Sequence, residues 1–466
     1  MAASVREWAS GSCVSVGVVQ LRSAARPALP GIDCGLTGRR LLSNCARMVT
    51  QGPRLNPFQP DAPARASIFS GRTPELKSIE TAIVDTLRGH PSHVLIVGER
   101  GMGKTSLARY VENLAQSPAV WGAAGVDVGP AVLFVSLGFS ATIPDACAAI
   151  LSEAYRWAQQ RGPSMVTWFQ NELSKLEGVS VGFFGVTAAV KAGGNTLPWA
   201  FPGALESFVQ RSEKAASGLV IILDETESIA ADPQFAPFIK SLLETLGQRR
   251  VNTVQLVVTA TPEGRDRMNS AHPSFSRLFR PLNVGRLADS EVRVLVHKAL
   301  QEGWPKKTAD EAFLSSMCVF ASGIPGFVHE IGKATFDVDT DNHLTEADFT
   351  QGVIGTDQVV GAMDVLEQKH FMERYSKKVL SNSYREVLHA MALAERDLKR
   401  AEIPTEEIRK RCPTVTQPGP YLANMVKRGV ISRVDGKRGT YQLPDRMFYA
   451  FLLLGGTRRS RKAAHL

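Results

Sequence analysis

The hydrophobic pattern in the first half of the chain alternates between short apolar runs and longer stretches with helical spacing. Residues 94–97, 131–137, 218–223 and 253–260 form β-branched and aliphatic runs of strand length, and a fifth strand is expected after Arg280. Runs without polar alternation are typical of parallel strands that are buried on both faces. Alternation of strand and helix therefore predicts an α/β fold, with a parallel sheet joined by right-handed crossovers.

Residues 140–214 break this alternation. Amphipathic helices are expected around residues 144–159 and 166–176, and the glycine-punctuated "GVSVGFFGVTAAVKAGG" suggests a hairpin. We interpret the region as an insertion within the core or an elaboration of it.

The second half of the chain has mainly helical hydrophobic spacing. Residues 289–361 have a helical pattern and predict a small bundle. From residue 381, "SYREVLHAMALAERD" and "TEEIRKRC" predict two helices, and a third helix would turn Leu422, Met425 and Val426 inward. Two short strands around the turn "DGKRG" would follow. Three helices and a hairpin predict a winged-helix domain over residues 381–454, followed by a basic tail, 455–466.

Residues 1–47 do not fit a folded element. They are rich in Ser, Ala, Gly and Arg, poor in acids, and without a sustained period. This composition is that of an organellar transit peptide, but it also suits an extended gene prediction in which translation begins at Met48. We favour the second interpretation, because the later motifs are bacterial in style.

The first strand leads into a phosphate-binding motif, "GERGMGKTS". Gly98, Gly103, Lys104 and Thr105 fit G-x-x-x-x-G-K-[ST], between an apolar strand and an amphipathic helix. The glycines let backbone N–H groups and the helix N-terminus face a polyphosphate, with Lys104 reaching the β- and γ-phosphates and Thr105 ligating Mg²⁺. The predicted nucleotide-binding residues are Gly98, Glu99, Arg100, Gly101, Met102, Gly103, Lys104, Thr105, Ser106 and Asp224.

An acidic pair ends the third strand, about 120 residues downstream, in "LVIILDETES". Asp224 is expected to hold Mg²⁺, directly or through water, and Glu225 to orient and deprotonate an attacking water. Ligands of open α/β sheets bind at the carboxyl ends of the strands. The pair therefore favours an ATPase over a simple phosphate binder.

Further candidates follow the fourth strand. The hydroxyls of Thr259 and Thr261 are candidates for sensing the γ-phosphate, with a structural strand residue as the alternative for each. In "HPSFSRLFRPL", Arg277 and Arg280 precede the expected fifth strand. An arginine there can stabilise transition-state charge in the site of an adjacent subunit. We prefer Arg277, which precedes Leu278 and Phe279; an exposed structural arginine is the alternative.

In this order, "GERGMGKTS", "LVIILDE", "VVTATPE", "SRLFRPL" and the helical bundle resemble the AAA+ ATPases, over residues 56–454. Within them the chain is similar to the origin-recognition-type ATPases and to bacterial ATP-binding proteins with a C-terminal winged helix. The resemblance implies a P-loop AAA+ core over residues 48–288, a helical lid over 289–361 and a winged helix. It also implies adenine contacts from "NPFQP" and "SGRTPEL", namely Pro57, Phe58, Gly71 and Arg72.

The lid departs from the family pattern. Many relatives read Gly-x-Pro-Arg, with an arginine that touches the γ-phosphate, whereas this chain has Gly323, Pro325 and then Gly326. The missing arginine favours slow turnover, or a switch that mainly binds nucleotide.

The segment "DVDTDNHLTEAD" imitates a calcium loop. Asp337, Asp339, Asp341 and Asp348 occupy positions one, three, five and twelve, but Asn342 stands where a glycine is needed. A solvated loop followed by a helix that Thr345 caps is the preferred interpretation.

Composition narrows the classes of function. No apolar stretch is long enough to cross a membrane, and none of the six cysteines has metal-ligand spacing, so a cytoplasmic location is expected. Residues 351–466 hold 21 Lys and Arg against 12 Asp and Glu. This excess favours an anionic partner such as duplex DNA, which Lys427, Arg428, Arg433, Lys437 and Arg438 would meet beside the wing.

These observations predict an enzyme that binds ATP with Mg²⁺, hydrolyses it, and couples its nucleotide state to DNA binding or to assembly with itself or another protein. The alternative is a STAND-type signalling switch with slow hydrolysis and a winged helix that contacts protein. A metabolic kinase is disfavoured, because the sequence shows no acceptor pocket.

Overall fold

The computed structural model describes residues 55–138, 142–175, 179–182, 185–188, 197–372, 375, 378–379 and 381–454. The described residues belong to one compact unit, Arg54–Leu466. The predictions for residues 1–47 and 455–466 fall outside the described residues. In the described ranges, no helix has the length and apolarity to cross a membrane.

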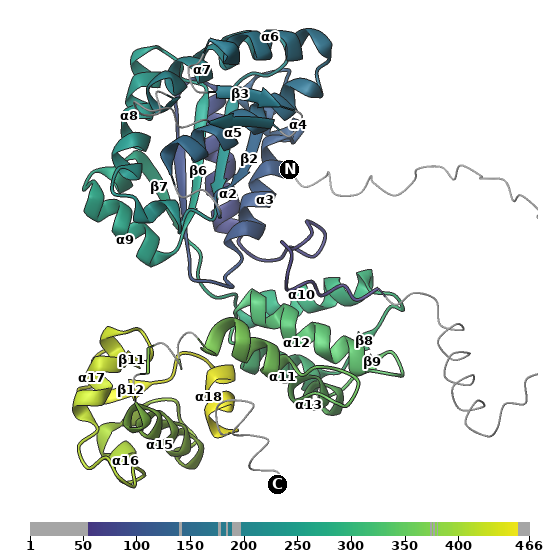
Figure 1. Ribbon diagram of the computed structural model, residues 1–466. Coiled ribbons are helices and arrows are strands. Elements are labelled where there is room, and N and C mark those ends of the chain that lie inside the picture. Colours follow the sequence, from purple (N-terminus) through teal and green to yellow (C-terminus); the bar gives the residue numbers. More distant parts are fainter. Residues whose placement is uncertain are drawn as a thin grey trace, which may run out of the picture. The chain divides into compact units, whose positions relative to one another are not determined.

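The core is a five-stranded parallel sheet in the order β2-β5-β6-β1-β7 (Figure 1). Its strands are β1 (His93–Val97), β2 (Ala131–Ser136), β5 (Leu219–Asp224), β6 (Val254–Ala260) and β7 (Phe279–Asn283). Every residue of β5 and β6 is buried, as the uninterrupted apolar runs predicted. The predicted α/β fold is confirmed, with one local correction: Arg280 lies within β7 rather than before it.

Helices cover both faces of the sheet because successive strand residues point to opposite sides. Val94 and Ile96 pack with α2 (Thr73–Leu87) and α3 (Lys104–Ala115). Leu95 and Val97 belong to the opposite cluster, whose helices are α5 (Ile143–Gln159), α7 (Leu197–Ser212) and α8 (Phe235–Gln248). The smaller elements of the core are α4 (Pro118–Ala124), η1 (Ile229–Ala231), α9 (Pro262–Ala271) and η2 (Phe275–Leu278).

The irregular region between β2 and β5 contains the predicted helices and hairpin. Helix α5 is followed by α6 (Pro163–Ser174) and by the antiparallel pair β3 (Val179–Gly182) and β4 (Gly185–Ala188), before α7 returns to the sheet. This hairpin lies beside α5.

The lid is a helical bundle joined to β7. Its helices are α10 (Asp289–Glu302), α11 (Glu311–Ala321), α12 (Pro325–Val338) and α13 (Glu346–Ile354), with a short parallel pair, β8 (Thr308–Ala309) and β9 (His343–Leu344). The chain then continues through α14 (Ala362–Leu366) and the π-helical segment η3 (Glu367–Phe371).

The calcium-like segment of the lid is a capped turn. Asp339 is 1% exposed and pairs with Lys307 at 2.5 Å, so its carboxylate neutralises a buried ammonium. Thr345 and Asp348 form a capping box at the start of α13. Among the described residues no cluster of three or more His, Cys, Asp and Glu side chains could hold a metal. Asp339 therefore has a structural role as the partner of Lys307, and the capped helix that the sequence favoured is confirmed.

The C-terminal module, residues 381–454, contains the three helices and the hairpin that the sequence predicted. The helices are α15 (Asn382–Leu398), α16 (Thr405–Arg409) and α17 (Gly419–Lys427), and the hairpin is β11 (Ser432–Arg433) with β12 (Thr440–Gln442). Leu422 and Met425 are buried as expected. Two elements were not predicted: β10 (Ile403–Pro404), which pairs with β12, and α18 (Arg446–Leu453).

Candidate functional site

The loop between β1 and α3 has the backbone shape that its glycines permit. Gly101 and Gly103 adopt left-handed φ angles of 82° and 85°, which side chains with a Cβ disfavour. Gly103 is the N-cap of α3, and no side chain caps its first N–H groups. The N-terminus of α3 therefore keeps uncompensated donors and the positive end of the helix dipole, which together suit an anion.

Lys104 lies at the first position of α3, among acidic groups. Its Nζ is 3.4 Å from the carbonyl oxygen of Glu99 and 3.8 Å from a carboxylate oxygen of Glu227. Burial lowers the pKa of Lys104, and the charges of Glu227, Asp224 and Glu99 oppose that shift. The structure thus brings the predicted phosphate-binding cation into the field of the acids that follow β5.

The acidic pair is held by its neighbours in the sheet. Asp224 is 2% exposed, and the Thr259 hydroxyl donates to its Oδ1 at 2.6 Å. Glu225 has a left-handed φ of 57°, and its N–H donates to the same hydroxyl at 3.3 Å. The Ser136 hydroxyl donates to Glu225 Oε2. Thr259 therefore fixes the acids on the inner side, while Ser136 engages the carboxylate from the neighbouring strand.

Thr261, the other candidate γ-phosphate sensor, caps a helix instead of contacting the acidic pair. Thr261 is the N-cap of α9 and accepts a hydrogen bond from Gly264 N at 3.1 Å. Only Thr259 of the two candidate sensors thus contacts the acidic pair.

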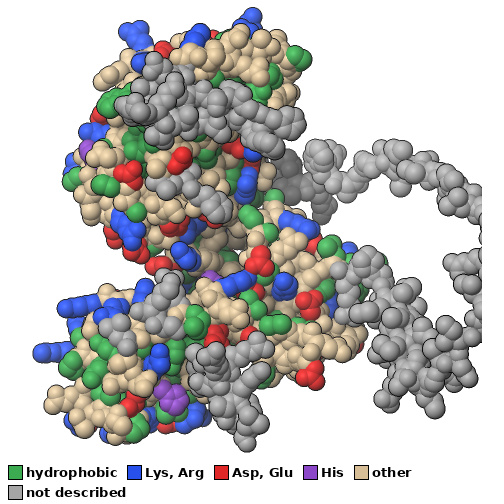
Figure 2. Space-filling view, in the orientation of Figure 1, with side chains coloured by type: hydrophobic (Ala, Val, Ile, Leu, Met, Phe, Trp, Pro, Cys, Tyr) green, Lys and Arg blue, Asp and Glu red, His purple; other side chains and the backbone are tan. Residues whose placement is uncertain are grey.

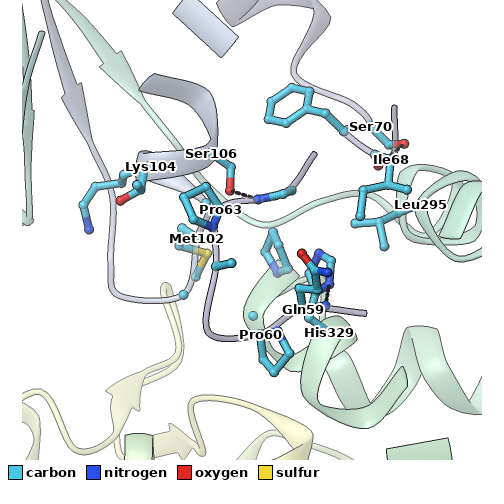
Figure 3. Close-up of a pocket in the computed structure, with 18 of the residues that line it drawn as sticks. Gln59, Pro60, Pro63, Ile68, Ser70, Met102, Lys104, Ser106, Leu295 and His329 are labelled. Carbon is cyan, nitrogen blue, oxygen red and sulfur yellow. Dashed lines mark hydrogen bonds between the residues drawn. The ribbon is translucent and has the colours of Figure 1, made fainter. Parts of the chain in front are cut away.

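A cavity of about 340 Å³ lies next to these groups. Gly101–Ser106 of the loop and α3 line it, together with Glu225, the arm (residues 59–64) and the lid residues Leu287, Leu295, Pro325, Gly326 and His329. In Figure 3, Lys104 lies on one side of this space and Ile68, Leu295 and His329 lie on the other. The cavity thus runs from a cationic end to a mainly apolar end.

The arm closes the apolar end through two hydrogen bonds to other elements (Figure 3). Ala64 N–H donates to Ser106 Oγ at 3.0 Å, and Gln59 N–H donates to His329 Nδ1 at 3.3 Å. Burial lowers the pKa of His329 to about 4. The ring is therefore neutral near pH 7, and because Nδ1 accepts a hydrogen bond its proton is on Nε2.

The predicted adenine contacts are only partly placed at the cavity. Arg72 lines it, and its guanidinium donates to Met102 O at 3.3 Å and to Gly285 O at 2.5 Å. Pro57, Phe58 and Gly71 do not line it. Phe58 instead packs under the lid, edge-on to His329, where a Cβ at Gly332 would come within 2.5 Å of its ring.

Other predicted residues lie around the cavity rather than in its wall. Glu99 and Arg100 line a separate cleft on the lid side of the loop. Gly98 is a packing position, since a Cβ there would lie 2.8 Å from Val284 O. Asp224 is buried behind Glu225 and is not part of the lining.

The lid docks directly on the loop at Gly326, the position where the family pattern implied by the resemblance has an arginine. Gly326 N–H donates to Gly101 O at 3.0 Å, and a Cβ at Gly326 would lie 3.2 Å from Gly101 Cα. A side chain at this position would push against the loop backbone. Close approach of two backbones therefore explains a glycine here.

The two candidate finger arginines differ in their surroundings. Arg280 donates to Ser78 O at 3.2 Å and lies 3.7 Å from Asp85, so it ties β7 to α2. Arg277 is exposed in η2, and its side chain has no hydrogen-bond partner in the described part of the chain. Neither lines the cavity.

Three contributors were missed from the sequence, namely Ser136, Glu227 and His329, and of the arm only the stretch "NPFQP" was expected near the site. Ser136 could have been found, because it ends β2 in register with Asp224 and strand ends meet at one edge of a parallel sheet. His329 had no such signal, since only the folding of α12 against the arm brings it to the cavity.

Comparisons with known proteins agree with this geometry. Residues 68–258 match the family model described as an AAA ATPase domain. The fold is similar to that of the ORC2 protein of Aeropyrum pernix, with a TM-score of 0.54 and 16% identity over 84% of this chain and 95% of that one. A Walker-type ATPase of Pyrococcus abyssi is similar at a TM-score of 0.50 and 14% identity, over 85% of this chain and 99% of that one. No curated protein matches the sequence.

Proposed function

We propose that this chain, whose residues 68–258 form an AAA ATPase domain, binds ATP with Mg²⁺ in the cavity beside Lys104 and hydrolyses it to ADP and phosphate. One observation carries the proposal: the uncapped N-terminus of α3, the Lys104 ammonium and the Glu225 carboxylate meet around a single cavity. The cationic end suits the phosphates, and the apolar end suits the base.

The residues divide the chemistry between them. Lys104 and the first N–H groups of α3 would bind the β- and γ-phosphates. Glu225 would orient and deprotonate the attacking water once its carboxylate leaves Ser136. Thr259 would hold Asp224 and the backbone of Glu225 in place.

The donor set fits a magnesium ion. Mg²⁺ prefers oxygen ligands and uses one or two protein groups together with substrate phosphates. Thr105 lines the cavity, and its side chain makes no hydrogen bond within the described ranges. The Thr259 hydroxyl donates to Oδ1 of Asp224 and leaves Oδ2 of that carboxylate for another partner. When bound, the ion would neutralise phosphate charge.

The C-terminal module would carry the coupling to DNA as a winged helix. Lys and Arg side chains gather on the face of the module drawn in Figure 2, over α17 and the β11–β12 hairpin. Arg428 donates to Lys378 O at 3.1 Å and Lys437 pairs with Glu402. Three of the five predicted DNA-contacting side chains are exposed and make no side-chain hydrogen bond or ion pair within the described residues, namely Lys427, Arg433 and Arg438. These three cations are therefore available to contact phosphates.

Neutralising Arg433 and Arg438 to Gln should weaken duplex DNA binding to a similar degree for all sequences. Each lost phosphate contact should reduce the slope of log affinity against log salt by about 0.9, so the slope should fall by about 2. Fluorescence anisotropy across a salt series measures it. Lys77→Gln with Lys214→Gln, two exposed lysines of the ATPase domain, is the matched control. A wild-type chain without DNA affinity at low salt would remove the DNA role.

Arg277 would act on an adjacent copy of the chain, because it is exposed and absent from its own cavity. Turnover per chain should then rise with protein concentration, and Arg277→Ala should abolish that rise in a steady-state assay. Full activity of a strictly monomeric chain would assign Arg277 a surface role only.

A slow nucleotide switch is the second candidate. It is favoured by two observations: Ser136 engages the Glu225 carboxylate, and Gly326 stands where relatives carry the lid arginine. Phosphate release that stops near one equivalent per chain would support the switch, whereas sustained release stimulated by DNA would support the ATPase. A cytoplasmic location suits both.

A further inference from the structure

The π-helical segment η3 joins the lid to the C-terminal module. Three consecutive side chains within it contact different parts of the molecule. Lys369 bonds to the arm and to α12, His370 packs beside α12 and the phosphate-binding loop, and Phe371 contacts α18. Single π-helical turns are frequent at functional sites.

Lys369 joins two carboxylates from elements far apart in sequence. Its ammonium lies 2.6 Å from Glu330 Oε1 on α12, and it also pairs with Asp61 of the arm. Partial burial would lower the pKa of Lys369, but the hydrogen bonds to Asp61 and Glu330 outweigh this and raise it. The Glu330 side chain is only 6% exposed, so its carboxylate depends on this cation for compensation.

Asp61 belongs to the wall of the nucleotide cavity. It lies in the arm between Gln59, which donates to His329, and Ala64, which donates to Ser106. The bond to Lys369 is a third attachment of this wall, and it is the attachment that comes from the junction segment. The hydrogen bond to Lys369 also lowers the pKa of Asp61, so this carboxylate stays charged.

The same segment is packed into the C-terminal module. The ring of Phe371 lies 5.6 Å from that of Phe448 and 5.3 Å from that of Phe451, both on α18. On the other side, the His370 ring lies 5.2 Å from that of Phe327, and a Cβ at Gly101 would come within 3.6 Å of it. A shift of the segment would therefore disturb the arm, the loop and the module together.

We propose that Lys369 is a positioning residue that holds the arm against the lid as the outer wall of the nucleotide cavity, and that it thereby links nucleotide retention to the packing of the C-terminal module. The inference rests on the proposed function, because it concerns how the cavity keeps its nucleotide. Coupling between two sites is reciprocal. A change that detaches the arm from the lid should therefore also reduce the effect of bound nucleotide on the C-terminal module.

The deciding variant is Asp61→Asn in the full chain, measured by stopped-flow release of a fluorescent ADP analogue into excess ADP. This change removes the ion pair of the arm attachment, so that only a neutral acceptor faces Lys369, and it leaves the pair between Lys369 and Glu330 in place. Release should accelerate about threefold or more, in keeping with the strength of an exposed ion pair. Loss of a negative charge from the cavity wall would by itself favour retention of an anionic nucleotide and slow its release, so the two explanations predict opposite signs.

Companion variants separate positioning from simple destabilisation. Lys369→Arg should release at the wild-type rate, because it keeps both ion pairs. The double variant Lys369→Met with Glu330→Gln removes the ammonium without stranding a buried carboxylate, and it should match Asp61→Asn. Asp127→Asn, an exposed aspartate away from the cavity lining, is the control and should leave the rate unchanged.

Hydrogen exchange tests the link to the module. ADP should slow amide exchange in α18 of the wild type, and this protection should be lost in Asp61→Asn. Release at or below the wild-type rate in Asp61→Asn, or unchanged protection of α18, would overturn the inference while leaving the proposed function intact. A wild-type chain that does not bind the analogue would overturn both.

Discussion

Lys104→Ala should raise the Kd for Mg·ATP about 100-fold or more, equivalent to about 3 kcal/mol. The physical reason is the charge balance of the site. The Lys104 ammonium lies 3.8 Å from Glu227, and the charges of Glu227 and Asp224 both act on it. Without it, an anionic nucleotide would meet those carboxylates and Glu225 uncompensated. Isothermal titration of ATP in the presence of Mg²⁺ measures the effect.

The control for this change is Lys77→Ala, an exposed lysine on α2, which should bind ATP like the wild type. The melting temperature of both variants without nucleotide should stay close to that of the parent, because neither lysine is one of the buried hydrophobic side chains of the core. Unchanged ATP affinity in Lys104→Ala would contradict the assignment of the cavity as a nucleotide site.

Glu225→Gln should lower steady-state ATP turnover by about 100-fold or more, the usual range for loss of a general base. ATP affinity should stay within about threefold, because a tenfold change in Kd requires about 1.4 kcal/mol of lost binding free energy. Gln has the shape of Glu and can still bond to Ser136, so the strained backbone at this position and its bond to Thr259 are kept. The change therefore removes the proton acceptor and little else. Phosphate release and ATP binding, measured on the same preparation, separate the two effects.

Glu213→Gln, an exposed glutamate at the end of α7, is the matched control and should turn over normally. Turnover of Glu225→Gln at the wild-type rate would show that another group activates the water. Glu227, which approaches Lys104, would then be the next residue to test.

Much of the fold could be predicted because the sheet is buried on both faces. Strand β5 is aliphatic up to its final aspartate, and β6 adds only Gln255 and Thr259 to its aliphatic residues. Apolar runs of this length that are bounded by Gly or Pro are most simply explained as buried strands. The two-residue strands were harder. β10 has only Ile403 and Pro404, and it exists because β12 offers it a partner from another part of the chain.

The site was predictable to the extent that its residues are adjacent in sequence. The loop before α3 and the acids after β5 each form a local pattern whose chemistry can be read directly. The residues that form the opposite wall of the cavity could not be predicted from the sequence. His329, Asp61 and Lys369 come from three distant segments, and only folding places His329 and Asp61 in the wall of the cavity and Lys369 against Asp61.

The sequence alone determined which groups could grip a phosphate, because the turn, its lysine and the acid pair are local consequences of residue type and strand order. Only the tertiary structure decided how the candidate phosphate site is enclosed. Gly326 of the lid packs against Gly101, Thr259 bridges Asp224 and Glu225, and the Lys369 ammonium ties the arm to the lid. Such contacts depend on distances between segments far apart in the chain, and these distances are set by packing of the whole core rather than by any local pattern.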